Sequence, residues 1–397
     1  MSTQSRASGN KQGSFQRMKR RYRITFVSSP ATRASSARRD EEWLWNPSFH
    51  EEYDVKAYVF SKYRESSLEI AEIYTRGDAL LWLLGLPFRL VKARPDLLIT
   101  GMVYPEAMIA FIMGKILRQR SIVYDSHWYW PKSTLNHLIW PVARGIALHA
   151  NIIMVLNTRT KLFWKTAGVK EERILICHVY TATVNVTTQR QAHAAEIRKC
   201  FDNKNIILFV GRLIKIKGVD YLIQAFAKLG NHLNDSVLVI VGDGPERVNL
   251  TKLSEDLRLS NVHFMGAVWD EDFKAALYLA CDIFVLPSVT MDVAEEWGLA
   301  INEAMSVGKP VVTTNAVGSA FELVRQNVNG FVVPEKSIQS LSNALHVLVE
   351  NDRMRSVMGE RSKEIIKEEF ELTKAQRDLR KIIDHARRLR PEPQRSF

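Results

Sequence analysis

Two glutamates, Glu295 and Glu303, flank a helix start that the sequence places near Gly298. Glu295 then lies in the entry loop, and Glu303 lies about 7.5 Å along the helix axis at a rise of about 1.5 Å per residue. The two carboxylates could bind separate parts of one extended ligand. Between them, the unpaired amides of Gly298 and Leu299 and the positive end of the helix dipole would suit a diphosphate. This spacing is typical of a sugar-nucleotide site, although an amphipathic helix with solvated glutamates explains the same residues.

A second strand, turn and helix supplies cations for such a diphosphate. The apolar residues 206–210 predict a buried strand, and a glycine-bounded basic loop follows it. In this loop Gly211 permits close backbone approach, Arg212 offers a planar fork for phosphate oxygens, and Lys217 precedes the next helix. Lys215 is expected to face solvent. The two predicted loops therefore complement each other in charge.

Four motifs in the second half of the chain carry a family resemblance. They read GRLIKIKG from Gly211, VGDGP from Val241, DIFVLPS from Asp282 and EEWGLAINEAMSVGKPVV from Glu295. Together they resemble the retaining GT-B glycosyltransferases of family 4, the group 1 glycosyl transferases, from residue 206 onward. The resemblance implies an α/β fold of GT-B type, with two Rossmann-like domains facing a central cleft. It also implies a nucleotide-diphosphate sugar as donor substrate, without a cofactor or a metal.

The resemblance assigns roles to individual residues. Arg212 and Lys217, with backbone groups of Gly298 and Leu299, would hold the donor diphosphate. Glu295 would hydrogen-bond the sugar hydroxyls and orient the sugar, and Glu303 would bind the ribose. Two loop segments would line the pocket for the nucleotide base: Gly242, Asp243, Gly244, Ala267 and Val268.

One histidine of the first half lies where catalysis is expected. His127 follows a predicted strand at residues 121–124, at the edge where open α/β sheets bind ligands. A lone histidine is more often structural. Relatives often have a histidine near the donor sugar at this place, so the resemblance makes His127 a catalytic candidate, together with Glu295. The nearby Asp125 is expected to cap the following helix.

The acceptor side departs from the family pattern. Residues 28–36 contain no glycine pair where many relatives have a glycine-rich loop, and residues 178–181 replace an Asn-Gly turn. In the retaining mechanism that the resemblance implies, the acceptor attacks on the face of the leaving group, and the departing diphosphate takes the acceptor proton. Arg212, Lys217 and the helix start at Gly298 would stabilise the developing charge.

A metal-dependent alternative rests on the triplet Asp270-Glu271-Asp272, which is formally a DxD motif. Asp270 is placed to cap the following helix, and the other two acids suit its first turn. We favour the capping interpretation. The site prediction therefore includes no metal.

The organisation of the chain is that of two α/β domains. Its 397 residues are 46% hydrophobic, which suffices for two cores. Strands alternate with helices, as in parallel sheets with helical crossovers. We predict a basic disordered tail (1–20), a first domain (21–185) and a second domain (195–370). The resemblance implies that these are an acceptor-binding and a nucleotide-sugar-binding Rossmann-like domain, and that a C-terminal helix (371–397) crosses back to the first domain. The polar residues 181–193 are the predicted linker. Strands of the first domain are predicted at residues 24–28, 55–60, 96–100, 121–124 and 151–156.

Composition also bears on location and partners. Three cysteines without metal-binding spacing, no N-terminal apolar run and no long apolar segment predict a reduced, cytoplasmic protein. The net charge is +12. The first 23 residues contain no acid and carry a cluster of basic residues: Arg6, Lys11, Arg17, Lys19, Arg20, Arg21 and Arg23.

Such a tail would attract an anionic membrane surface or nucleic acid. Seven of the nine tryptophans lie in the first half, and residues 80–89 could dock at a membrane interface. We therefore expect a glycan or lipid-linked acceptor, with the protein cytoplasmic and peripheral on the cytoplasmic face of the membrane. Nucleic acid is disfavoured because no RNA-binding or zinc motif is present. Two alternatives stay open: a non-catalytic nucleotide-sugar-binding or nucleic-acid-binding protein, and a sugar-nucleotide epimerase on the same fold.

Overall fold

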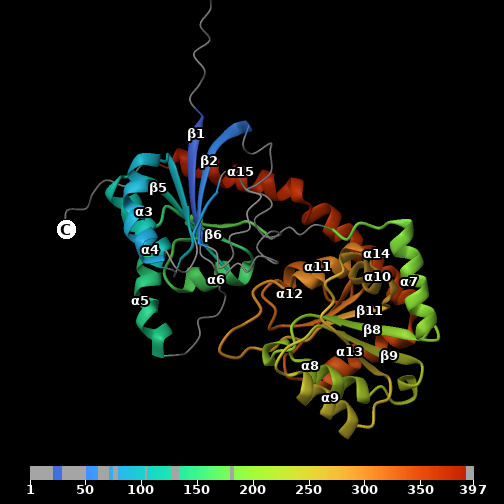
Figure 1. Cartoon of the computed structure of the whole chain (residues 1–397). Helices are drawn as coiled ribbons and strands as arrows, with labels where there is room; N and C mark the ends of the chain where they lie inside the picture. The colour runs from blue at the N-terminus through green and yellow to red at the C-terminus, as the bar shows by residue number, and fades with distance from the viewer. Residues whose placement is uncertain are drawn as a thin grey trace, which may run out of the picture.

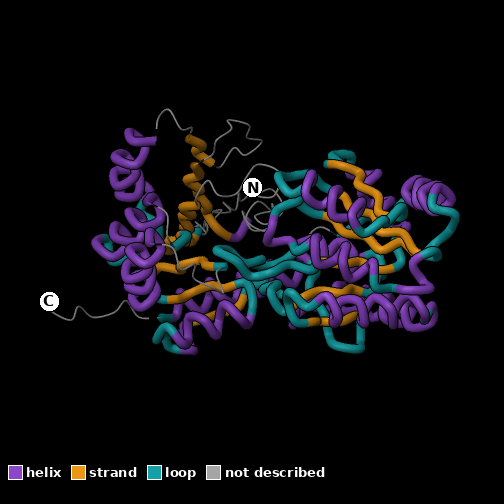
Figure 2. The backbone as a smooth tube through the Cα atoms, turned by 90° about the horizontal axis from the view of Figure 1, so that it is seen from below, coloured by secondary structure: helices purple, strands orange, loops and turns teal. Residues whose placement is uncertain are grey.

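The computed structural model describes residues 21–28, 51–60, 71–74, 79–102, 105–126, 134–178 and 183–389. These residues form two α/β domains, each with a parallel sheet covered by helices (Figure 1). Seen from below, the two sets of strands lie apart, with loop segments between them (Figure 2). The basic tail, residues 29–50 and His127 lie outside the described residues. The same is true of residues 179–181, part of the segment 178–181 that stands in place of the Asn-Gly turn of relatives.

The first sheet has the strand order β3-β2-β1-β4-β5-β6-β7. Its strands are β1 (Tyr22–Ser28), β2 (Tyr53–Phe60), β3 (Ala71–Tyr74), β4 (Leu97–Thr100), β5 (Arg120–Asp125), β6 (Ile152–Val155) and β7 (Ile174–Ile176). Its helices are α3 (Ala79–Ala93), α4 (Pro105–Ile116), α5 (Thr134–His149) and α6 (Thr158–Thr166). The five predicted strands are present. The sequence pattern does not predict the short edge strands β3 and β7.

The second sheet has the order β10-β9-β8-β11-β12-β13. Its strands are β8 (Asn205–Val210), β9 (Ser236–Val241), β10 (Val262–Gly266), β11 (Ile283–Leu286), β12 (Val311–Thr314) and β13 (Gly330–Val333). Its helices are α7 (Thr188–Cys200), α8 (Val219–Ala227), α9 (Arg247–Asp256), α10 (Glu271–Ala280), α11 (Leu299–Ser306), α12 (Ala320–Leu323), α13 (Ile338–Glu350) and α14 (Asp352–Glu369). Every residue of β9, β11 and β12 is buried, as expected for strands covered by helices on both faces.

The last helix, α15 (Leu372–Arg388), leaves the second domain and packs on the first (Figure 1). Leu379, Ile382 and Ile383 are buried in one cluster with Ile24 and Ile122 of the first sheet. Apolar burial therefore joins the end of the chain to the first domain.

The prediction of a linker through residue 193 is wrong. Helix α7 begins at Thr188, and the side chain of Thr187 caps it by accepting a hydrogen bond from the amide of Arg190. Only Ala194 and Ile197 of this helix are buried. The sequence therefore shows little hydrophobic periodicity although it forms three turns of helix.

Candidate functional site

The site is built where the strand order of the second sheet reverses. Strands β8 and β11 are neighbours in space, while the chain runs outward from them in opposite directions. Their carboxyl ends therefore open at the topological switch point, the usual ligand crevice of an open α/β sheet. The loop after β8 carries Arg212 and Lys217, and the loop after β11 carries Glu295 and Gly298. The topology thus brings the two predicted loops together.

Lys217 and Glu295 form an ion pair across this switch point. Each side chain is only 15% exposed. The hydroxyl of Ser288, just after β11, lies 3.4 Å from the same carboxylate oxygen, Oε2. Gly211 lies next to the Lys217 side chain: a Cβ atom on it would lie 3.8 Å from Cε of Lys217, which is ordinary van der Waals contact. The pair is charge-balanced and largely removed from water, so each charge stabilises the other in the free protein.

Gly298 is the N-cap of α11, with a positive φ of 85°. A Cβ atom there would lie 2.8 Å from Cδ2 of Leu286, so the turn into the helix requires glycine both for conformation and for space. The turn aims the amides at the start of α11 toward the switch point. A helix start of this kind favours an anion.

Glu303 lies on α11 and is 8% exposed. Its Oε2 accepts a hydrogen bond of 2.7 Å from the hydroxyl of Tyr278, and its Oε1 lies 3.5 Å from Nζ of Lys274. Both partners belong to α10. These contacts fix the carboxylate and compensate its charge.

The VGDGP motif at the end of β9 packs closely against the loop that follows β8. The amide of Gly211 donates to the carbonyl of Val241, and the amide of Leu213 donates to the carbonyl of Asp243, both at 2.9 Å. A Cβ atom on Gly242 would lie 1.8 Å from the carbonyl oxygen of Gly211. Close contact of the two backbones therefore requires Gly242, whatever the ligand.

The remaining predicted residues lie at the same edge of the sheet. Arg212, Asp243 and Ala267 are exposed, and Val268 is half-buried. Among the described residues, the Arg212 guanidinium has no hydrogen-bond or ion-pair partner. Asp243 accepts from the amide of Gly244 at 2.8 Å, so it shapes its own loop. Arg212 is thus an available cation next to a paired one.

Hydrogen bonds between the two domains lie next to Glu295 and the start of α11. The sequence motifs do not predict these hydrogen bonds. Ser126 donates a hydrogen bond to the carboxylate of Glu296, the neighbour of Glu295. Asn157, at the start of α6 and fully buried, donates from Nδ2 to the carbonyl of Glu296 at 3.2 Å. The amide of Thr158 donates to Oε1 of Glu322 at 2.6 Å. The loop that carries Glu295 is therefore held from the first domain as well as from the second.

An aromatic cluster packs against the same loop at Trp297. His178 lies with its ring centroid 6.1 Å from that of Trp297 and 5.3 Å from that of Phe370. Trp297 is buried and donates to Asn302 at 2.8 Å. Burial lowers the pKa of His178 below its ordinary value. A histidine kept neutral in this way acts here as an aromatic packing residue.

The predicted cap role of Asp125 is wrong. This aspartate lies at the end of β5, is 2% exposed, and accepts a hydrogen bond of 2.7 Å from Nε1 of Trp164. Helix α5 begins only at Thr134. The buried indole needs an acceptor, and the aspartate supplies it.

Asp270 does cap α10, as predicted. Its Oδ1 accepts from the amides of Asp272 and Phe273 at 2.8 and 3.2 Å. Asp272 forms an ion pair with Arg190, and Glu271 forms one with Lys274. The three acids of the triplet therefore have structural partners.

Comparison with known proteins shows what the second domain resembles. Residues 191–365 match the sequence profile of the family "Glycosyl transferases group 1". The chain as a whole has the GT-B fold: it matches the crystal structure of Anabaena HepE in complex with UDP with a TM-score of 0.72, at 20% identity over 91% of this chain and all of that one.

Two glycosyltransferases are examples of relatives that are similar in sequence. An uncharacterized glycosyltransferase of Methanocaldococcus jannaschii, MJ1069, is 25% identical over 84% of this chain and 87% of its own length. The GDP-mannose-dependent alpha-(1-6)-phosphatidylinositol monomannoside mannosyltransferase of Mycobacterium tuberculosis is 34% identical over 41% of this chain. This second match spans 43% of the mycobacterial enzyme, less than half of its length.

Proposed function

We propose that this protein is a retaining, metal-independent glycosyltransferase of family 4 that transfers a sugar from a nucleotide-diphosphate sugar to a glycan or lipid-linked acceptor. The observation that carries the proposal is the Lys217–Glu295 pair beside the start of α11 at the switch point. A cation, an available Arg212 and a helix start suit a diphosphate, and a carboxylate next to them suits sugar hydroxyls. In this proposal Glu303 binds the ribose, and the loops at Gly242 and Ala267 flank the base.

The proposed transfer takes place on one face of the sugar. The acceptor oxygen forms a bond to the anomeric carbon on the face from which the diphosphate leaves. The bond between that carbon and the diphosphate oxygen breaks, and the acceptor proton passes to the departing diphosphate. Lys217, Arg212 and the amides at the start of α11 stabilise the negative charge that develops there. Glu295 orients the sugar, and His127, outside the described residues, is the proposed catalytic group of the first domain.

Donor binding and transfer are tested separately. A thermal-shift screen with UDP-, GDP- and ADP-sugars should show stabilisation by one of these donors. Transfer to lipid-linked and glycan acceptors, followed by NMR of the anomeric proton, reports the configuration of the product. Lys217→Ala should lower kcat/KM by about 10²–10³-fold, whereas the exposed neighbour Lys215 provides the matched control Lys215→Ala. Full activity of Lys217→Ala would refute the site, and inversion at the anomeric carbon would refute the mechanism.

The acceptor proposal rests on an apolar face of α3. Successive residues of an α-helix are rotated by about 100° around the helix axis. On α3, the apolar side chains on one face, within an arc of about 100°, are exposed: Leu80, Leu81, Leu84, Phe88 and Val91. Residues on the opposite side are buried: Trp82, Leu86, Leu90 and Ala93. A helix that is apolar on both its buried and its exposed side has more apolar surface than the domain core covers.

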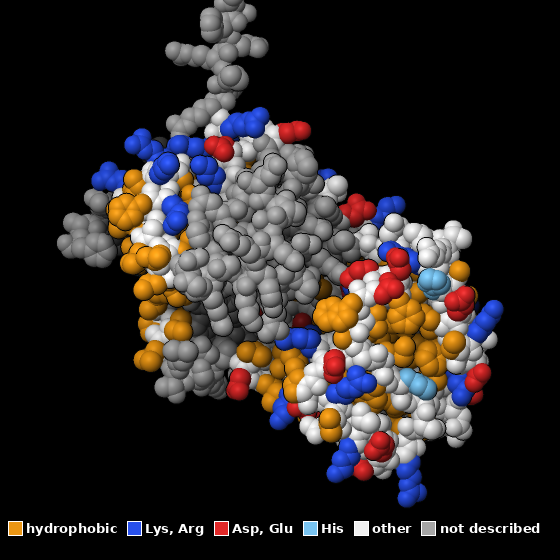
Figure 3. Space-filling model, viewed as in Figure 1, with side chains coloured by type: hydrophobic (Ala, Val, Ile, Leu, Met, Phe, Trp, Pro, Cys, Tyr) orange, Lys and Arg blue, Asp and Glu red, His pale blue; other side chains and the backbone are white. Residues whose placement is uncertain are grey.

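Exposed apolar residues of two neighbouring helices and nearby basic residues extend this face. Ile112 and Ile116 of α4 and Leu138 of α5 are also exposed. Figure 3 shows hydrophobic side chains along the edge of the first domain where Figure 1 places α3, α4 and α5, with Lys and Arg side chains next to them. Lys92 and Arg94 are exposed at the end of α3. Apolar side chains flanked by cations suit an anionic lipid surface.

We therefore propose that the protein lies on the cytoplasmic face of a membrane, held by α3 and by the basic residues 1–20. Among the described residues, no helix has the length and apolar character that crossing a bilayer requires. Deletion of residues 1–20 should weaken binding to anionic vesicles at low salt and have little effect at high salt, because the tail acts through charge. Equal binding by the deleted protein at low salt would exclude the tail.

A further inference from the structure

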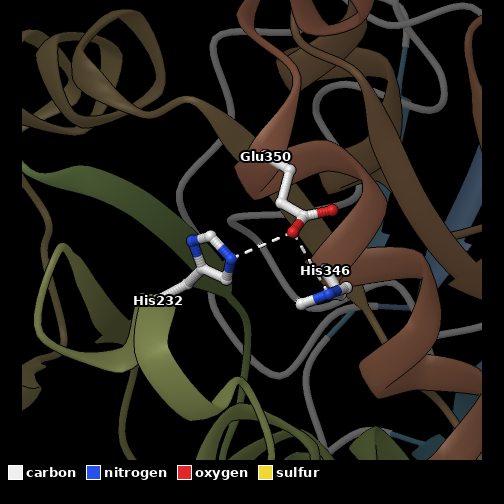
Figure 4. A group of neighbouring side chains, drawn as sticks. All are labelled: His232, His346 and Glu350. Atoms are coloured by element: carbon white, nitrogen blue, oxygen red, sulfur yellow. Dashed lines mark hydrogen bonds and ion pairs between the residues drawn. The ribbon is translucent and has the colours of Figure 1, made fainter.

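Two histidines and a glutamate form a cluster far from the proposed donor site. His232 lies in a short 3-10 helix, Gly230–Leu233, and His346 and Glu350 lie one turn apart on α13. Nε2 of His232 lies 3.0 Å from Oε1 of Glu350, and Nε2 of His346 lies 3.3 Å from the same oxygen. Figure 4 shows both rings directed at this carboxylate. One candidate ligand atom from each residue lies within 4.8 Å of the others.

These distances match those between ligands of one metal ion. Zinc binds histidine nitrogen and carboxylate oxygen at about 2.0–2.2 Å in a tetrahedron, which places neighbouring ligand atoms about 3.3–3.5 Å apart. The two distances to Oε1 need only small adjustments to reach this value. Two nitrogens and one oxygen form a common three-ligand set for zinc, and water supplies the fourth ligand. All three side chains are accessible to solvent, so an ion and its water could enter directly.

The cluster lies at the opposite edge of the sheet from the donor residues. The 3-10 helix of His232 immediately precedes β9, and Glu350 is the last residue of α13, whose body packs on α8. The cluster therefore lies near the amino end of β9, whereas Gly242 follows its carboxyl end. A metal here would act on the stability of the domain and not on the donor.

We propose that His232, His346 and Glu350 bind one divalent transition metal ion of the zinc type. The ion would replace the histidine–glutamate contacts by three metal–ligand bonds. It would join the segment before β9 to the end of α13, which are 118 residues apart at His232 and Glu350. Because the unfolded chain does not hold these ligands together, binding favours the folded state.

The test uses the full chain without a histidine tag, freed of metal by a chelator that is then removed. Isothermal titration with ZnCl₂ should show one strong site, and zinc should raise the Tm by at least about 3 °C at saturating concentration. Co²⁺ should give the visible absorption of a tetrahedral site. His232→Ala, His346→Ala and Glu350→Gln should each lower zinc affinity at least about tenfold.

Two control variants identify where the zinc binds. His193→Ala removes a histidine of α7 that does not belong to the cluster, and Cys200→Ser removes the exposed thiol; both should keep the full effect of zinc. Donor-induced thermal shifts should be unchanged in His346→Ala, which also shows that this variant is folded. The proposal is overturned if zinc does not change the Tm of the wild-type protein. It is also overturned if His232→Ala and His346→Ala respond to zinc as the wild type does, or if Cys200→Ser abolishes the response.

Discussion

The apolar face of α3 allows a quantitative test of membrane binding. The perturbation is the double substitution Leu81→Ser and Phe88→Ser, which makes one side of this face polar. Both side chains are exposed, at 74% and 78%, so their removal leaves no cavity in the core. Trp82 and Leu86, which anchor the helix to the domain, are unchanged. We therefore expect the variant to fold with near wild-type stability.

The magnitude follows from the exposure. Complete burial of a leucine or phenylalanine side chain contributes about 1.5–3 kcal/mol, and about three quarters of each of these two side chains is available. The pair can therefore contribute roughly 2–4 kcal/mol to membrane binding when both enter the lipid. Since 1.4 kcal/mol corresponds to a factor of ten, we expect vesicle affinity to fall by about 30-fold or more.

Co-sedimentation with liposomes measures this affinity. Vesicles of phosphatidylcholine with phosphatidylglycerol are compared with phosphatidylcholine alone, each at low and high salt. The matched control is Val248→Ser with Val357→Ser, two exposed apolar residues of the second domain, at 78% and 55% exposure. The loss caused by the α3 variant should persist at high salt, because apolar burial is not screened.

Two results would refute this reasoning. If the α3 variant binds vesicles like the wild type, the exposed face does not contact lipid. If the control variant loses as much affinity as the α3 variant, binding depends on general surface hydrophobicity and not on α3. Circular dichroism and the Tm of both variants show that the comparison is made between folded proteins.

Three further predictions concern stability, each measured by urea unfolding. Gly242→Ala should destabilise the protein by about 2–4 kcal/mol because the new Cβ meets the backbone of Gly211. The control Gly145→Ala, in open space within α5, should be neutral or stabilising. Equal effects of the two substitutions would contradict the close contact at Gly242. The wild-type protein should lose stability below about pH 6.5, and His178→Phe should remove this loss. Burial lowers the pKa of His178 in the folded state, so the unfolded state binds more protons as the pH falls. An unchanged dependence of stability on pH in the variant would contradict this. Asp270→Ala should cost about 1 kcal/mol through the lost cap, and no change would show that the cap is dispensable.

The sequence predicts best the elements that are buried on both faces. Residues 206–210 read as an unbroken apolar run because β8 is covered on both sides, and they form that strand. The edge strands β3 and β7 are only four and three residues long, so they carry little pattern. Helix α7 resembles a linker for a related reason: Ala194 and Ile197 are its only buried residues. Periodicity reports burial, and a mostly exposed helix lacks it.

The site can be predicted in part, because the sequence describes each loop locally but does not show that the two loops meet. The types and spacing of Glu295, Gly298 and Lys217 predict a diphosphate site from sequence alone. That Lys217 pairs with Glu295, 78 residues away, depends on which strands are neighbours at the switch point. The contact of Ser126 with Glu296 spans 170 residues and two domains. A single sequence holds no pattern that reports such contacts.

The Lys217–Glu295 pair also bears on how the proposed donor would bind. A lysine that is only 15% exposed requires an anion, and in the free protein Glu295 is that anion. A donor diphosphate would offer Lys217 a second anion, and the carboxylate would then be available to the sugar hydroxyls that lie next to it. The exposed Arg212 could meet the diphosphate first, because its guanidinium has no partner among the described residues to give up. In this view the ion pair keeps both side chains in place until the donor arrives, so the site need not reorganise its loops to bind it.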